Sequence, residues 1–170
     1  MTTSTTSTPR TGPHGPQCGC ASHAPTVPSV YETLDELEWA RSLHGASASG
    51  DFARVKAKLS SSAHTNINAL DEHGYSPLHY ASRQGHVEIV RALCAAGANP
   101  NIGPRGGTQL PPLHRAVLAG SAATARVLRE FGACVAVVDG EGRTARDVFD
   151  EEYAKGRIKR VDEWESVWRA

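Results

Sequence analysis

A Leu-His-x-Ala frame recurs three times along the chain at a constant step of 35 residues. A glycine follows four residues after the alanine of every copy, so the copies share more than the frame itself. Self-similarity at a fixed period is typical of solenoids, in which each repeat buries its apolar face against the next. The copies begin at Leu43, Leu78 and Leu113, and their glycines are Gly50, Gly85 and Gly120.

The histidine of this frame is interpreted as a structural residue. If each Leu-His pair did chemistry, the chain would need three active sites in series, and no spacing indicates a Ser or Cys nucleophile with a paired base and an orienting group. Each imidazole has two ring nitrogens that can bond backbone groups of its own repeat and of the neighbouring one. We therefore expect His44, His79 and His114 to hold repeats together, and we expect no enzyme activity.

Residues 71–101 carry the clearest copy of the repeat. Ser76 and Pro77 predict a helix start, because a hydroxyl at the N-cap accepts an orphan backbone N–H and proline at the first helical position has no donor to leave unpaired. Gly85 can take the left-handed conformation that ends this helix. A second helix is predicted to follow and to end at Gly97. Its apolar face would comprise Val87, Ile89, Val90, Leu93 and Cys94.

The motifs G-x-S-P-L-H-x-A, G-H-x-x-I-V and G-A-N-x-N in this segment resemble the ankyrin repeat. LHGASASGDFARVKAKL before it and LHRAVLAGSAATARVLREFGA after it keep the frame more loosely, with Leu110-Pro111-Pro112 where a Thr-Pro capping pair is expected. The resemblance implies an all-α ankyrin-repeat solenoid of about four helix-turn-helix repeats with hairpin-like loops. The order of parts over residues 17–148 also resembles one small ankyrin-repeat family that is not known for enzyme activity.

Composition and repeat spacing predict the domain boundaries. Residues 1–28 are rich in Thr, Ser, Pro and Gly, so they are predicted to form a disordered tail ahead of a repeat domain over residues 29–170. The repeats are predicted at about 36–68, 71–101, 105–138 and 139–170. In the last one we expect a first helix about one turn longer, ending at Gly156, and a second helix with Ile158, Val161, Trp164 and Trp168 on one face.

Charge and hydropathy exclude several classes of protein. Lys+Arg and Asp+Glu both number 18, and no basic stripe with stacking aromatics is present, so nucleic-acid binding is not expected. No apolar run approaches the roughly 18 residues that span a bilayer, and the N-terminus has no apolar signal region. We expect a cytoplasmic or nuclear address, where Cys94 and Cys134 would be reduced thiols.

Two segments suggest chemistry and need an alternative explanation. Residues 103–109, GPRGGTQ, are glycine-rich but lack the G-K-[ST] ending of a phosphate loop, so a loosened connection is preferred and no cofactor is expected. The tail holds four potential zinc ligands within ten residues: His14, Cys18, Cys20 and His23. A metal- or redox-responsive regulator using Cys18, Cys20 and His23 is therefore the alternative to an incidental cluster on a flexible tail.

The resemblance implies that hairpin tips and exposed positions of the inner helices form a concave binding surface. We expect it to bind another protein, with the chain acting as a monomeric, non-catalytic adaptor. Three of its arginines are predicted to face one groove and to favour an acidic partner segment. The predicted contact residues are Glu72, His73, Tyr75, Arg83, Gln84, Arg105, Glu141 and Arg143. Asn101 in the second hairpin also resembles a substrate of an Asn hydroxylase.

Overall fold

The computed structural model describes residues 38–39, 41–61, 66–103 and 110–169. They belong to one compact unit, Thr33–Ala170. Their α-helices form four successive pairs, each a first helix, a short turn and a second helix. The helices are α2 Leu43–Ser49, α3 Phe52–Ser60, α4 Pro77–Gln84, α5 Val87–Ala95, α6 Pro112–Leu118, α7 Ala122–Glu130, α8 Ala145–Ala154 and α9 Asp162–Trp168.

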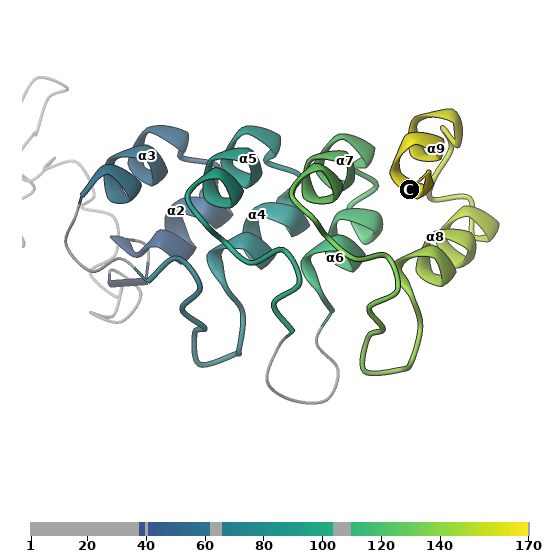
Figure 1. The fold of residues 1–170 in the computed structure, drawn as a ribbon, viewed down its shortest axis with the longest axis horizontal. Helices are drawn as coiled ribbons and strands as arrows, with labels where there is room; N and C mark the ends of the chain where they lie inside the picture. Colours follow the sequence, from purple (N-terminus) through teal and green to yellow (C-terminus); the bar gives the residue numbers. More distant parts are fainter. Residues whose placement is uncertain (1–37, 40, 62–65, 104–109, 170) are drawn as a thin grey trace, which may run out of the picture. The chain divides into compact units, whose positions relative to one another are not determined.

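The helix pairs stack so that the helices form two rows (Figure 1). The first helices α2, α4, α6 and α8 pack side by side in one row, and the second helices α3, α5, α7 and α9 form the other. The described parts of the connections between pairs extend beyond the first helices (Figure 1). The described residues contain no strand beyond an isolated bridge between Val138 and Thr144. This arrangement confirms the predicted all-α solenoid.

The start and end of α4 follow the sequence signals. Ser76 lies at the N-cap and Pro77 is the first helical residue, while the side chain of His79 completes a capping box by accepting the backbone N–H of Ser76 at 3.0 Å. Gly85 ends the helix with φ +75°. Glycine is also required at Gly50, because φ is +78° and an added Cβ would lie 2.8 Å from the His86 ring.

The core lies between the two rows, and the frame residues are part of it. The leucine and alanine of each Leu-His-x-Ala copy have exposed fractions of 5% or less. The predicted apolar face of α5 is also correct, because Ile89, Val90, Leu93 and Cys94 are buried. Cys94 is a free thiol, as predicted. Residues that recur at the repeat period are therefore the ones whose side chains pack between neighbouring repeats.

Asparagine side chains join successive hairpins. Asn68 donates from Nδ2 to the carbonyl of Gly97 and accepts the N–H of Asn99 on Oδ1. Asn101, which stands 33 residues later, repeats the pattern: it donates to Gly132 at 2.9 Å and accepts the N–H of Cys134 at 2.7 Å. We call these two residues the asparagine ladder. The next position of the ladder is Cys134, whose short thiol replaces the amide.

The last repeat differs partly from its prediction. α8 is 10 residues long, against 7 or 8 for the other first helices, and Gly156 follows it with φ +71°, as expected. The predicted second helix is wrong at its start, because α9 begins at Asp162 and Ile158 lies in the connection before it. Acidic residues in the first turn of α9 favour a start there. Val167, which the periodicity missed, is fully buried.

Candidate partner-binding site

The hairpin that precedes α4 is held by Asp71. Its Oδ1 accepts the backbone N–H groups of His73 at 3.0 Å and Tyr75 at 2.8 Å, and its Oδ2 accepts the phenol of Tyr80 at 2.6 Å. Burial raises the pKa of Asp71, but the hydrogen bonds from Tyr80 and from the backbone of Tyr75 outweigh this and hold it below its ordinary value. One carboxylate thus fixes both the hairpin and a side chain of α4.

Aromatic rings gather beside this hairpin. The ring of Tyr80 meets those of Trp39 and Tyr75 edge-on, with centroids 5.8 and 5.9 Å away. The guanidinium carbon of Arg115, on α6, lies 4.2 Å from the centre of the Tyr75 ring. Trp39 is 42% exposed, and Tyr75 and Tyr80 are half-buried. The rings therefore combine a fixed geometry with surface that a partner could cover.

A groove between α4 and α6 continues this surface. Its volume is about 210 Å³, and it is lined by Arg83, Arg115, Leu118 and Ala119. Arg83 is exposed, and the Leu118 side chain is 46% exposed. We define the aromatic–arginine patch as the contiguous set Trp39, Tyr75, Tyr80, Arg83, Arg115 and Leu118.

The predicted contact residues of the second repeat lie in or beside this patch. Glu72 and His73 are exposed at the hairpin, with side-chain exposures of 86% and 67% and an ion-pair distance of 3.7 Å between them. Arg83 and Gln84 end α4 and are exposed. Tyr75 supports Arg115, so it shapes the surface as well as presenting area to a partner.

Arg143 has a different environment from the one predicted. Its guanidinium donates to Asp139 from Nε at 3.1 Å and from a terminal nitrogen at 2.9 Å, and it also pairs with Glu141 and Glu151. The Asp139 side chain is 1% exposed, and the hydrogen bonds from Arg143 and the backbone overcome the effect of burial to lower its pKa. The charge of Arg143 is thus compensated within the fourth hairpin. Arg143 is not among the residues that line the groove of Arg83.

The three frame histidines bond the backbone, in agreement with the structural interpretation. His44 and His114 reach the following hairpin through Nε2, to the carbonyls of Ala69 and Arg143. His79 instead caps its own helix through Nδ1. At His114 this cap is missing, because Pro111 occupies the N-cap and has no N–H to donate.

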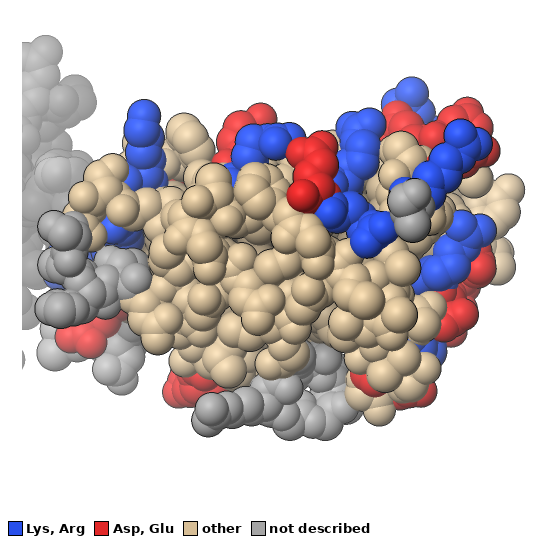
Figure 2. Space-filling view, in the orientation of Figure 1, with Lys and Arg blue, Asp and Glu red and all other residues tan. Residues whose placement is uncertain are grey.

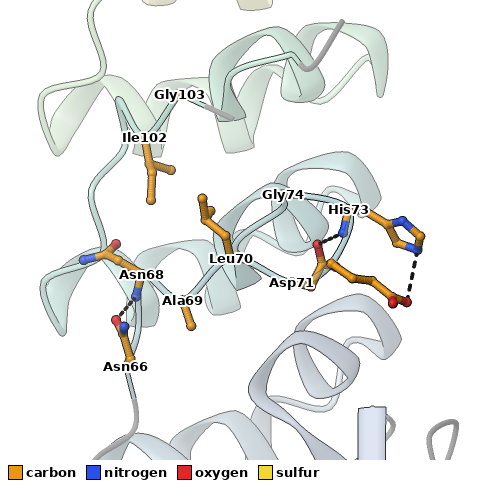
Figure 3. A pocket seen from close by; sticks show the side chains of 10 residues that line it. Asn66, Asn68, Ala69, Leu70, Asp71, His73, Gly74, Ile102 and Gly103 are labelled. Carbon is orange, nitrogen blue, oxygen red and sulfur yellow. Dashed lines mark hydrogen bonds and ion pairs between the residues drawn. The ribbon is translucent and has the colours of Figure 1, made fainter. Parts of the chain in front are cut away.

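A larger cavity, of about 720 Å³, lies on the hairpin side of the second repeat (Figure 3). Its described wall runs from Asn66 to Gly74 and includes Ile102 and Gly103. Leu70 and Ile102 point toward one another across it. Residues 62–65 and 104–109, which continue this wall in sequence, lie outside the described residues, and so does the predicted contact residue Arg105.

Charges gather on the second helices. Figure 2 shows Lys and Arg along the side formed by the second helices and, with Asp and Glu, at the end formed by α8 and α9, while the centre of the face in view is free of charged residues. Part of this charge is compensated, as in the Arg91–Glu130 pair at 3.0 Å between α5 and α7. No described helix is long and apolar enough to cross a membrane.

Metal binding by the tail is not tested by the structure. His14, Cys18, Cys20 and His23 lie outside the described residues, as does the whole of the predicted disordered tail. Within the described residues, no group of three or more His, Cys, Asp or Glu side chains is placed to hold a metal ion.

Sequence reasoning missed Trp39, Tyr80, Arg115 and Leu118 as surface residues. A signal for two of them was available: Tyr80 and Arg115 stand at the x position of Leu-His-x-Ala, between residues that the fold buries. Leu118 stands 35 residues after Arg83, so the repeat register also places these two side chains at equivalent positions of adjacent helices.

A family model described as ankyrin repeats (3 copies) matches residues 43–139, which is more than half of the chain. The match begins at the first residue of α2 and ends at Asp139 in the last hairpin. No match was found among the curated proteins.

Proposed function

Since the chain belongs to the ankyrin repeat family, we propose that it is a non-catalytic adaptor that binds another protein through the aromatic–arginine patch and the adjacent hairpin. Ankyrin repeats are generally protein–protein interaction modules, and domains built from them are generally non-catalytic. The observation that carries the proposal is the continuous run of exposed or half-buried Trp, Tyr and Arg side chains across α4, α6 and their hairpin. These residue types dominate binding energy at protein interfaces.

The resemblance to one small ankyrin-repeat family supports a cellular compartment for this function. The segments ETLDELEWARSLHGASASGDFARVK and GYSPLHYASRQGH resemble ankyrin repeat domain-containing protein 39. With this resemblance we propose a monomeric protein of the cytoplasm or nucleus. The remaining contact residues of the proposal are Glu72, His73 and Gln84 around the patch, with Arg105, Glu141 and Arg143 at the later hairpins. The metal- or redox-responsive alternative rests on Cys18, Cys20 and His23 and has no support among the described residues.

The proposal is tested by affinity capture with matched variants of the full chain. The patch variant carries Trp39→Ala, Arg83→Ala and Leu118→Ala, three exposed residues of the aromatic–arginine patch. The control variant carries Lys56→Ala, Glu88→Ala and Arg126→Ala, exposed positions on the second helices. All three proteins are first shown to have the same melting temperature.

Immobilised proteins are incubated with an extract of the cells that naturally express the chain, and the bound proteins are quantified by mass spectrometry. We expect at least one protein to be recovered by the wild type and the control and to be lost by the patch variant. Equal recovery by all three would refute the patch as the binding site. Deleting residues 1–28 is expected to leave recovery unchanged, whereas the regulator alternative requires a zinc or oxidation response that the deletion abolishes.

A further inference from the structure

We propose that the groove between α4 and α6 recognises a linear peptide segment in which an acidic side chain binds Arg83 and Arg115 and a neighbouring apolar side chain contacts Leu118. This inference rests on the proposed function and specifies the chemistry of the partner. Its acidic site differs from the one that the sequence suggested, because Arg115 takes the place of Arg105 and Arg143.

The repeat register makes this groove. Tyr80 and Arg115 are equivalent residues of α4 and α6, and so are Arg83 and Leu118, each pair being separated by 35 residues. Because the frame residues next to them are buried, these side chains project from the same side of adjacent helices. Arg83, Arg115 and Leu118 consequently line one cavity.

The two arginines in this groove have no acceptor among the residues that the structure describes. Within the described part of the chain, neither Arg83 nor Arg115 forms an ion pair, and the buried Nε of Arg115 donates to nothing. Some exposed arginines do have carboxylate partners, such as Arg91 with Glu130 and Arg146 with Asp150. A guanidinium without a partner is complementary to a carboxylate, because its parallel N–H groups match the two oxygens.

Arg115 is also held in place before a partner arrives. Its guanidinium stacks on Tyr75 at 4.2 Å, and the backbone N–H of Tyr75 is bonded to Asp71. Stacking uses the face of the guanidinium and leaves the N–H groups of its two terminal nitrogens available, whereas Nε is buried. Since less side-chain freedom remains to be lost, binding of an anion here is less costly than on a free arginine.

Leu118 adds an apolar contact to the site. It lies at the end of α6, 46% exposed, in the same groove as the two arginines and next to exposed Ala119. An isolated exposed leucine is common on protein surfaces. Here Leu118 supplies apolar surface beside the positive charges of two arginines. The partner that fits best therefore carries an acidic residue and an apolar residue close together.

The test uses a phage library of short random peptides selected on the immobilised full chain. We expect peptides selected by the wild type to be enriched in Asp or Glu beside an apolar residue. Double charge reversal, Arg83→Glu with Arg115→Glu, is expected to remove this enrichment and to select Lys or Arg instead. Because Arg115 packs on Tyr75, the single variant Arg83→Glu is selected in parallel. Arg126→Glu on α7 is the control and should select the same peptides as the wild type.

Affinity is then measured with a synthetic peptide from the wild-type selection by fluorescence anisotropy. Arg83→Glu is expected to weaken binding by about tenfold or more, and Leu118→Ser by a few-fold. A phosphoserine version of the peptide, with the acidic residue replaced, is measured beside it. If only the phosphorylated version binds, the carboxylate proposal is wrong and the arginines bind phosphate.

Two further outcomes would also overturn the inference: no enrichment above the bare support, and enriched peptides without acidic residues. Enriched peptides without acidic residues would leave the proposed function intact if the variant Trp39→Ala still bound them more weakly than the wild type, because Trp39 is a patch residue outside the groove. Peptides that bind all the variants equally would contradict the patch itself, as equal recovery in the capture experiment would.

Discussion

Protonation of His79 is expected to destabilise the folded chain. The ring is 1% exposed, and its unprotonated Nδ1 accepts the N–H of Ser76 at the start of α4. Burial, followed by the positive charge of Arg115, lowers the pKa of His79 from 6.5 to about 4, although Asp71 acts in the opposite direction. The unfolded chain therefore takes up a proton near pH 6.5 that the folded chain does not bind until about pH 4.

The size of the effect follows from this difference. The stabilising contribution of neutral His79 is complete above the unfolded pKa and is lost as the pH falls from 6.5 to about 4. Between about pH 7.5 and about pH 5 the loss is about 2 kcal/mol of unfolding free energy. Aspartate and glutamate are largely ionised over this range, so they contribute little of the change.

Urea unfolding of the wild type and of His79→Gln, followed by circular dichroism at both pH values, measures this loss. Glutamine at the third helical position can still accept the N–H of Ser76, but it does not titrate. The pKa of His114 is also lowered, chiefly by burial, and this residue is present in both proteins, so its effect cancels in the comparison. We expect the variant to lose about 2 kcal/mol less than the wild type. An equal loss of unfolding free energy in the two proteins would refute the conclusion that His79 is buried in its neutral form.

Two other side-chain environments give direct expectations. Replacing Arg143 with glutamine leaves the buried carboxylate of Asp139 without its cation, so we expect the free energy of unfolding in urea to fall by about 2 to 4 kcal/mol. The control Arg91→Gln breaks an exposed ion pair and should lower it by about 0.5 kcal/mol or less. Burial raises the pKa of the Cys94 thiol to about 11, so Cys94 should react slowly with maleimide. Peptide mapping after a brief maleimide treatment of native protein should find exposed Cys134 labelled and buried Cys94 unlabelled. Equal labelling of the two cysteines would mean that α5 opens readily.

The fold was predictable because its determinants are local and repeated. Ser76, Pro77 and Gly85 predict the limits of α4 by capping chemistry alone. The start of α9 was missed because apolar periodicity extends back to Ile158, while the acidic first turn decides where the helix begins. In the last repeat Asp147 replaces histidine in the capping box with Thr144, a substitution that the Leu-His frame does not reveal.

The candidate site was only partly predictable, because its properties depend on pairs of residues from different repeats. Sequence alone cannot tell that Arg115 stacks on Tyr75 while Arg143 is neutralised by Asp139. Both were candidates as exposed arginines, and only the folded chain distinguishes a cation without an acceptor among the described residues from one held by carboxylates. The repeat register does point to Tyr80 and Arg115 at the x position of the second and third frames, although the x residue of the first frame, Gly45, is buried.

The asparagine ladder bears on how the solenoid folds. In a linear array, cooperativity depends on the coupling between each repeat and its neighbour. Asn68 and Asn101 couple the first three repeats through paired hydrogen bonds, but Cys134 cannot make the same pair across the last junction. That junction depends instead on packing, on Arg129, which donates to the carbonyl of Val167, and on His114, which bonds the carbonyl of Arg143. The junction before the C-terminal repeat is thus the one without the hydrogen bonds of the asparagine ladder, and we expect local opening to separate its hairpins first.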